Sequence, residues 1–221
     1  MTNTASLVAV RAPEARFESL PGYHYPPHYV DDLPDYPGLR VHYLDARPAG
    51  AGSGRTFLCL HGQPTWCYLY RRMIPFFLAA GHRVVAPDLL GFGRSDQPVD
   101  DAAYTFTFHR TMLLQLFERL GLDRVTLVVQ DWGGLLGLTL PMEFPDRIDR
   151  LLVMNTGLGI GRSPGPGFDA WKQFVAARPD FAVGALMLRS TPHLTPAEVA
   201  AYDAPFPDAR HRAGVRRFPA L

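Results

Sequence analysis

The sequence is poor in cysteine, with only Cys59 and Cys67 among its 221 residues. Cys59 lies in a short apolar run that predicts a core strand, and Cys67 opens a predicted helix. Two such residues cannot form the disulfide framework of a small secreted protein. They favour a reducing compartment, and we expect a cytoplasmic protein.

Long apolar runs and an excess of charge of one sign are also absent. No apolar run approaches the length of a membrane-spanning helix. Residues 1–16 lack a basic segment followed by a long apolar core, so no secretory signal is predicted. The formal net charge of +1 gives no electrostatic basis for binding nucleic acid or an anionic membrane. We therefore expect a small molecule as the partner, not a nucleic acid or a membrane.

The chain contains enough apolar residues, 47% of the total, to form one large core or a core with a small cap. Short apolar runs alternate with segments of helical periodicity, which is typical of a mostly parallel sheet with helices on both faces. The predicted strands lie near Phe17 and at 40–44, 57–60, 83–86, 125–129 and 150–154. The predicted helices cover about 68–80, kinked at Pro75, then 108–120, ended by Gly121, and 135–142.

The most informative segment is the apolar run 125–129, which stops abruptly at Asp131. Gly133 and Gly134 follow, and then a predicted helix. A strand, a sharp turn and a helix form the nucleophile elbow of the α/β-hydrolase fold, and here Asp takes the place of Ser. A carboxylate at that place attacks carbon and forms an ester on its own side chain, which indicates displacement at an alkyl carbon. An Asp that only ends a strand through turn chemistry is the alternative.

A second segment supports the elbow. The predicted strand 57–60 is followed by His61, Gly62, Gln63 and Pro64. In this fold the oxyanion hole consists of the backbone N–H after the nucleophile and one N–H from the loop after this earlier strand. The candidates are the N–H groups of Trp132 and Gln63. We expect His61 to shape this loop and not to act as the catalytic base.

Three motifs together resemble the haloalkane dehalogenases, a hydrolytic branch of the α/β-hydrolase fold. The motifs are HGQPTW at 61–66, PDLLGFGRSD at 87–96 and VQDWGG at 129–134. The resemblance implies that Asp131 is the nucleophile and that the indole N–H of Trp132 binds the leaving halide. One subfamily has a second halide-binding Trp in its cap, and GFDAWK at 167–172 resembles that cap helix. It makes Trp171 the second donor and Phe168 a substrate contact. The implied partners are a haloalkane, a halide ion and water, with no cofactor or metal.

The two tryptophans suit the chemistry of a leaving halide. A halide leaving an sp³ carbon develops negative charge in a cavity with little water. An indole N–H donates a hydrogen bond and has no acceptor capacity, so two of them aimed at one point form a preorganised anion site. Ordinary burial of an aromatic ring is the alternative for both Trp132 and Trp171.

After Asn155 the composition changes to a connector rich in glycine and proline, at 157–167. We therefore divide the chain into an α/β-hydrolase core, residues 1–155, and a partial helical cap, residues 156–221. Thr195, with Pro196 and Glu198, predicts the capped start of a helix in the second part.

The sequence after Asp131 contains only two histidines, His193 and His211, both within the predicted cap. In this fold a carboxylate and then a base, normally His, follow the nucleophile, and both come after strands of the sheet. We expect these two histidines to be surface or cap residues. The last strands of the sheet, the acid and the base are then missing, which makes turnover doubtful and leaves strand 150–154 as an exposed edge.

Two alternatives of other kinds remain open. An epoxide hydrolase shares the fold and the Asp nucleophile, but it needs cap tyrosines to protonate the leaving oxygen. Tyr202 is the only tyrosine after Asn155, which counts against this alternative. A truncated, non-catalytic protein that keeps a halide-binding pocket is the other. A serine esterase is excluded by Asp131 at the nucleophile position.

Overall fold

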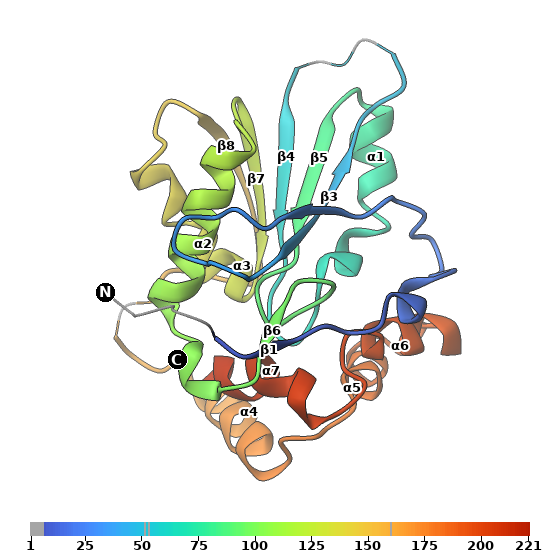
Figure 1. Cartoon of the computed structure of the whole chain (residues 1–221), viewed down its shortest axis with the longest axis vertical. Helices are drawn as coiled ribbons and strands as arrows, with labels where there is room; N and C mark the ends of the chain where they lie inside the picture. Colours follow the sequence, from blue (N-terminus) through green and yellow to red (C-terminus); the bar gives the residue numbers. More distant parts are fainter. Residues whose placement is uncertain (1–6, 51, 53, 160) are drawn as a thin grey trace.

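The computed structural model describes residues 7–50, 52, 54–159 and 161–221. Figure 1 shows a twisted sheet with α1 (Ile74–Ala79) on one side and α2 (Phe106–Arg119) and α3 (Trp132–Gly137) on the other, and with the helices of residues 166–220 gathered at one end of the sheet. Asp131 directly follows β7 (Val125–Gln130), which lies between β4 (Thr56–Leu60) and the edge strand β8 (Ile148–Met154). This architecture confirms the predicted α/β-hydrolase type of fold.

In the part of the chain that the structure describes, the main sheet has six strands in the order β2-β3-β5-β4-β7-β8. Strands β5, β4, β7 and β8 pair in parallel with one another in that order, whereas β2 pairs with β3 and β3 with β5 in antiparallel fashion. The strands are β2 (His28–Val30), β3 (Val41–Ala46), β4 (Thr56–Leu60), β5 (Arg83–Pro87), β7 (Val125–Gln130) and β8 (Ile148–Met154). A separate antiparallel pair consists of β1 (Ala9–Val10) and β6 (Gln97–Pro98).

Within the described residues, three α-helices flank the sheet and four lie in the C-terminal part. The flanking helices are α1 (Ile74–Ala79), α2 (Phe106–Arg119) and α3 (Trp132–Gly137). The C-terminal ones are α4 (Pro166–Ala177), α5 (Val183–Ser190), α6 (Pro196–Asp203) and α7 (Ala213–Arg217). Short 3₁₀ helices are η1 (Glu14–Phe17), η2 (Cys67–Tyr70), η3 (Asp101–Ala103), η4 (Leu140–Met142), η5 (Ala209–Arg212) and η6 (Phe218–Ala220). We refer to α4 through η6, residues 166–220, as the C-terminal helices.

The two clearest apolar patterns of the sequence, at 125–129 and 108–120, correspond to well-packed elements. In β7 the side chains of Val125, Leu127, Val128 and Val129 are fully buried, as expected for a strand covered on both faces. The helix predicted at 108–120 is α2. Its apolar positions face the core, the Thr105 hydroxyl caps its first turn, and Gly121 follows its end at φ +55°. Local sequence and tertiary packing therefore agree in the middle of the fold.

Two predictions before the elbow are wrong. The strand expected near Phe17 is the 3₁₀ turn η1, and the Phe17 ring packs edge-on against Trp66 at 5.4 Å between ring centroids. The continuous helix expected over 68–80 is divided into η2 and α1. Pro75 lies in the first turn of α1, where its missing N–H costs nothing, so it starts a helix instead of kinking one.

The helix after the elbow also differs from the expectation. It begins at Trp132, directly after Asp131, and it ends at Gly137 and not at 142. Pro141 has no N–H to donate to the carbonyl of Gly137, so the chain continues as the 3₁₀ turn η4. The start at Trp132 matters for the site because it fixes the N–H groups that follow Asp131.

The C-terminal helices are joined to the core by buried polar contacts. Glu198 accepts a hydrogen bond from Arg71 at 2.7 Å, and both side chains are almost inaccessible to solvent. The indole Nε1 of Trp66 donates to the carbonyl of Ala201 at 3.2 Å. The predicted capping box at Thr195 and Glu198 is present. The division of the chain at residue 155 remains a prediction.

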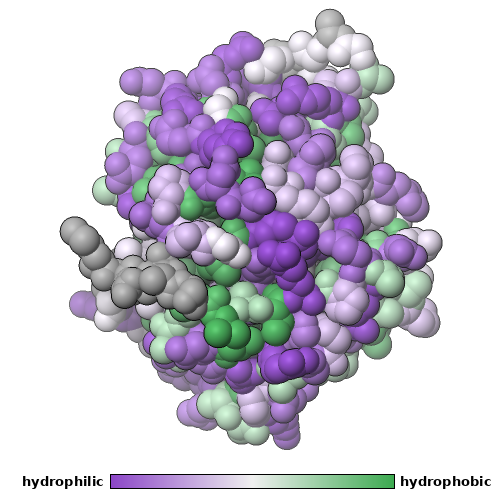
Figure 2. Space-filling model, viewed as in Figure 1, coloured by the Kyte–Doolittle hydropathy of each residue, from purple (hydrophilic) through white to green (hydrophobic). Residues whose placement is uncertain are grey.

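Strand β8 lies at the edge of the sheet, as predicted. Leu151 is 51% exposed and Val153 45%, so an apolar run faces solvent in this chain. None of the helices in the described part of the chain combines the length and apolar character of a membrane span. On the face shown in Figure 2, hydrophobic residues gather in the lower half, at the level of β1 and α7, in a mostly hydrophilic surface.

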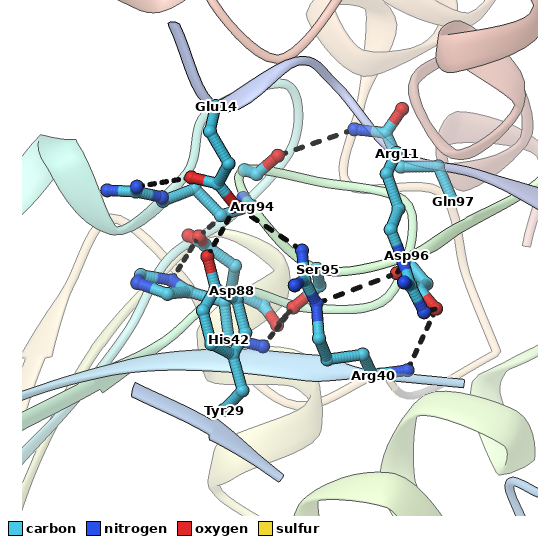
Figure 3. Close-up of polar contacts among 11 residues, drawn as sticks. Arg11, Glu14, Tyr29, Arg40, His42, Asp88, Arg94, Ser95, Asp96 and Gln97 are labelled. Carbon is cyan, nitrogen blue, oxygen red and sulfur yellow. Dashed lines mark hydrogen bonds and ion pairs between the residues drawn. The ribbon is translucent and has the colours of Figure 1, made fainter. Parts of the chain in front are cut away.

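A network of charged residues holds the loop after β5 against the N-terminal segment (Figure 3). Asp96 accepts two hydrogen bonds from Arg11, at 2.6 and 2.9 Å, and one from the backbone N–H of Arg40 at 2.9 Å. Asp88 lies 2.7 Å from Nδ1 of His42 and accepts the N–H of Arg94 at 2.9 Å. These contacts fix the loop after β5, which meets the loop after β4 where the N–H of Leu89 donates to Nε2 of His61.

Candidate active site

Asp131 is held in a strained turn between β7 and α3. Its φ is 52° and its ψ is −127°, a conformation that L residues rarely adopt and that costs about 1–3 kcal/mol. The Thr156 hydroxyl donates to the carbonyl of Asp131 at 2.6 Å, and the N–H of Gly134 donates to the same oxygen at 2.9 Å. The predicted sharp turn is therefore present, and these two hydrogen bonds to the Asp131 carbonyl hold it in place.

Two glycines leave room for this turn. A Cβ atom on Gly62 would lie 2.3 Å from Oδ1 of Asp131, and one on Gly133 would lie 2.0 Å from the carbonyl oxygen of Leu60. The second of these neighbours is backbone and cannot move away cheaply. The small residues of the two motifs are thus required by the close approach of the two loops.

The carboxylate of Asp131 is surrounded by N–H donors. The backbone N–H of Gln63 donates to Oδ1 at 2.8 Å. Burial raises the pKa of Asp131, and the N–H groups of Trp132 and Gln63 oppose that rise. The structure therefore brings together the three residues that the sequence singles out as nucleophile and N–H donors. Donors so placed favour negative charge on this carboxyl group.

The loop that carries Gln63 is fixed by its neighbours. Nε2 of His61 accepts the N–H of Leu89 at 3.0 Å, so the proton is on Nδ1, which lies 3.0 Å from the carbonyl of Gly62. Burial lowers the pKa of His61, which keeps this neutral form. The Thr65 hydroxyl donates to the same Gly62 carbonyl at 2.9 Å. His61 shapes the loop, as predicted, and has no ring nitrogen left for acid–base chemistry.

One buried group of side chains near this loop has the residue types of a metal site. The ligand atoms of His42, Cys67 and Asp88 lie within 4.8 Å of one another. His42 and Asp88 share a direct 2.7 Å hydrogen bond, Cys67 donates its backbone N–H to Asp88 at 2.8 Å, and its sulfur lies 3.1 Å from the Tyr23 hydroxyl. These hydrogen bonds account for all three side chains as structural links between loops.

Trp132 lies beside the nucleophile and is 8% exposed. Its ring meets the ring of Phe218 in an edge-on contact at 4.9 Å between centroids. Phe218 also lies 4.7 Å from the ring of His109, whose two nitrogens have no hydrogen-bond partner among the described residues. Burial is the main cause that lowers the pKa of His109 to about 3, so this imidazole is neutral.

The two residues predicted on the cap helix lie on α4 and are half-buried. The ring contacts of Trp171 within the described residues are with Phe174 and Phe181, both at 5.6 Å between centroids. Phe168 packs beneath the amine of Lys172 at 5.8 Å. No described contact joins either residue to Asp131 or Trp132, so their roles stay predictions.

The last helices, α7 and η6, contribute to this site in a way that the sequence did not predict. The side-chain amide of Gln63 donates to the carbonyl of Val215 at 2.8 Å, and Phe218 covers Trp132. No local pattern marks Val215 or Phe218, because both read as ordinary apolar residues of a short amphipathic segment. Only the folded chain places them against Gln63 and Trp132, the two residues that donate N–H groups to Asp131.

Comparison with known proteins agrees with this geometry. A family model of the alpha/beta hydrolase fold matches residues 55–203. A haloalkane dehalogenase of Psychrobacter cryohalolentis is 48% identical over 216 residues, which cover 96% of this chain and 70% of that protein. A solved haloalkane dehalogenase from Paraglaciecola agarilytica NO2 has a TM-score of 0.93 at 49% identity, covering 97% of this chain and 71% of that chain.

More distant similarity extends to a second class of enzyme. An epoxide hydrolase from Vigna radiata has a TM-score of 0.67 at 20% identity, covering 88% of this chain and 71% of that chain. Identity this low shows a shared fold alone. This similarity therefore adds no support to the epoxide hydrolase alternative.

Proposed function

Because the chain belongs to the haloalkane dehalogenases, hydrolases of carbon–halogen bonds, we propose that its chemistry begins with attack of the Asp131 carboxylate on a haloalkane. One carboxylate oxygen forms a bond to the sp³ carbon, and the electron pair of the carbon–halogen bond leaves with the halide. The product is an alkyl ester of Asp131. The single observation that supports this step best is the strained Asp131 at the end of β7, with Oδ1 held by the Gln63 N–H.

The leaving halide needs a donor that does not itself react. The indole N–H of Trp132 is adjacent to Asp131 in sequence, and its ring is almost completely buried. In such an environment a charge-assisted hydrogen bond is stronger than in water. Trp171 is the proposed second donor and Phe168 a proposed wall of the substrate cavity, with the C-terminal helices forming the cap.

Hydrolysis of the ester regenerates the carboxylate. Water attacks the carbonyl carbon of the Asp131 ester, and negative charge develops on the carbonyl oxygen. The backbone N–H groups of Gln63 and Trp132 are the proposed donors to that oxyanion. The alcohol then leaves and takes a proton, and the water molecule must lose one to a base.

The tyrosine that the epoxide hydrolase alternative requires is occupied elsewhere. Tyr202 is 3% exposed, and its hydroxyl accepts a hydrogen bond from Arg71 at 3.1 Å. Arg71 also pairs with Glu198, so this phenol belongs to the contact between α6 and the core. This observation favours the halide as leaving group.

The direct test of the proposal is covalent modification. We expect protein incubated with a short primary bromoalkane to gain one alkyl group, which peptide mapping by mass spectrometry places on Asp131. Far-ultraviolet circular dichroism verifies that the protein is folded. An unmodified Asp131 peptide in folded protein would contradict the proposed nucleophile.

We expect the substitution Trp132→Phe to weaken halide binding more than tenfold. Removing one charge-assisted hydrogen bond costs about 1.5–3 kcal/mol, and 1.4 kcal/mol corresponds to a factor of ten. Bromide quenching of indole fluorescence gives the affinity. Trp66→Phe is the matched control, because the Trp66 indole also donates a buried hydrogen bond, but to the carbonyl of Ala201. Equal affinities in the Trp132 variant and the wild type would refute the role of Trp132.

The alkylation rate is expected to fall as the pH decreases. The midpoint of this fall should lie at a higher pH than the pKa of an ordinary aspartate. Only the ionised carboxylate attacks carbon, and burial raises the pKa of Asp131. The rate is therefore full above the raised pKa and is lost as the pH falls through it. Adduct formation measured from acidic to neutral pH gives the midpoint. A midpoint at or below about 3.9, the value for free Asp, would contradict a buried nucleophile.

A further inference from the structure

Gln63 makes two hydrogen bonds that point to different parts of the molecule. Its backbone N–H donates to Oδ1 of Asp131 at 2.8 Å, and its side-chain Nε2 donates to the carbonyl oxygen of Val215, also at 2.8 Å. Gln63 is 8% exposed and Val215 is fully buried. Because a carbonyl can only accept, the partner of Val215 must be the amide nitrogen of Gln63.

The carbonyl of Val215 belongs to a well-anchored segment. Arg216, the next residue, forms two hydrogen bonds with the carboxylate of Asp101, at 2.6 and 3.2 Å. On the other side, a Cβ atom on Gly214 would lie 3.0 Å from the Tyr104 ring and 3.1 Å from the Phe92 ring. The start of α7 therefore packs closely against the core, and its backbone is a fixed point.

The same short segment contacts both residues that provide N–H groups to Asp131. Val215 accepts from the side chain of Gln63, and Phe218, three residues later, packs on the ring of Trp132. The segment formed by α7 and η6 therefore contacts Gln63 through its side-chain amide and Trp132 through its ring.

We propose that the side chain of Gln63 is a positioning residue, which ties the N–H held by Asp131 to the Val215 carbonyl and so couples the oxyanion site to the C-terminal helices. This inference rests on the proposed function of Asp131. The amide side chain acts through its own backbone: it fixes the peptide plane whose N–H meets Oδ1. Displacing α7 moves the Gln63 backbone, and with it the orientation of the attacking carboxylate.

The expected cost of losing this link is in rate and not in binding. A misplacement of about 1 Å at a reacting group can lower the rate about 10²-fold. The halide and the alkyl chain make no contact with the amide of Gln63 in this proposal. The concentration of haloalkane that gives half the maximal alkylation rate should therefore stay unchanged, while the maximal rate falls.

The substitution Gln63→Met tests the link, because it keeps the backbone N–H and the length of the side chain and removes the donor. We expect the maximal rate of Asp131 alkylation, followed by intact-protein mass spectrometry, to fall between tenfold and a hundredfold. The half-saturating haloalkane concentration and the bromide affinity should match those of the wild type. A fall in bromide affinity with no change in maximal rate would overturn the proposal.

Gln97 offers a matched control. It is fully buried, and its Nε2 also donates from the core to the C-terminal helices, to the carbonyl of Pro205 at 3.2 Å. It makes no described contact with Asp131. Gln97→Met removes the same kind of hydrogen bond, and we expect it to leave the alkylation rate within about twofold of the wild type, because changes far from the reacting groups and their supports are usually small. Equal losses in the two variants would mean that the Gln63 link is merely structural.

A second variant, Gln63→Glu, tests the same link through pH. A protonated Glu donates to the Val215 carbonyl, whereas an ionised Glu repels it. The ratio of the wild-type rate to the variant rate should therefore be near one at low pH and should grow as the pH rises through the pKa of the new carboxyl. Because the new carboxylate also raises the pKa of Asp131 in the variant, the Asp131 midpoint is determined in each protein and each rate is divided by the ionised fraction of Asp131. A ratio independent of pH would contradict the proposed donor.

The failure of this inference is distinguishable from the failure of the proposed function. If the wild type forms no ester at all, Asp131 is not the nucleophile. If the wild type and Gln63→Met form it equally fast, Asp131 is the nucleophile and the coupling is wrong. Hydrogen exchange at the Gln63 amide adds a readout that needs no substrate: exchange should be faster in Gln63→Met than in the wild type. Equal protection in both proteins would overturn the coupling.

Discussion

Replacing Asp131 by Asn is expected to abolish covalent capture of a bromoalkane. A neutral amide has no anionic oxygen to displace bromide. In other enzymes, removing a catalytic nucleophile lowers the rate by about 10⁴-fold or more. Intact-protein mass spectrometry should show the alkyl adduct on the wild type and none on Asp131→Asn after the same incubation. An adduct of equal yield on the variant would show that another side chain is the nucleophile.

Asp131→Asn is also expected to fold at least as well as the wild type, which makes it a clean test. Burial raises the pKa of Asp131 above its value in the unfolded chain. For an acid this means that the folded protein holds its proton more tightly, so the charged form destabilises the fold as the pH rises through that pKa. Asn removes this cost at neutral pH, and it tolerates the positive φ of this turn better than most residues. Thermal unfolding at neutral pH is the measurement.

A lower melting temperature of the Asn variant at neutral pH would contradict the raised pKa. Such an outcome would mean that the ionised carboxylate is stabilised by its N–H donors more than it is penalised by burial. The melting temperatures of the wild type and Asp131→Asn thus report the cost of the buried charge to stability, and their adduct yields report the nucleophilic reaction. Active sites often retain such costs because function requires the charge in a buried place.

The part of the site that lies within continuous sequence was predictable. The run 125–129 has to be a buried strand, and a strand that stops at Asp131 before two small residues can continue only through a sharp turn. The loop with Gln63 follows the neighbouring strand β4, so its N–H has to lie near the same end of the sheet. The segments that follow two adjacent parallel strands lie close together, because both strands end at the same edge of the sheet.

The contacts made by the C-terminal helices were not predictable in this way. Val215 and Phe218 lie in short helical segments whose docking position the local sequence does not determine. A helix packed on a surface can rotate and slide until its side chains fit. Their place beside Gln63 and Trp132 depends on contacts such as Arg71 with Glu198 and Arg216 with Asp101, each between residues far apart in the chain. Trp171 and Phe168, predicted by resemblance, remain untested for the same reason.

The 221-residue polypeptide is expected to release about one halide per Asp131 and then to stop, with the ester persisting. General-base catalysis contributes about 10²–10⁴-fold, and ester hydrolysis is the step that needs it. Of the histidines near the site, His61 has both ring nitrogens engaged by backbone groups. His109 is neutral, but its pKa of about 3 makes it a poor proton acceptor near neutral pH.

Halide release measured against protein concentration tests this expectation. A plot of halide released against time should show one burst whose amplitude equals the concentration of alkylated Asp131, with the adduct still present by mass spectrometry after the burst. Asp131→Asn should give no burst. Release of many halides per polypeptide would show that a base exists among these residues.

His211 is the residue to examine if turnover is sustained. It was expected at the surface or within the predicted cap, and it lies in the second of these places: it is 5% exposed and packed within the C-terminal helices. Its Nδ1 lies 2.8 Å from Oδ1 of Asp208, the arrangement in which a carboxylate orients a catalytic imidazole, and its Nε2 has no hydrogen-bond partner among the described residues. No described contact joins it to Asp131. We therefore expect His211→Ala to leave the burst amplitude unchanged, and loss of sustained release in that variant would identify His211 as the base.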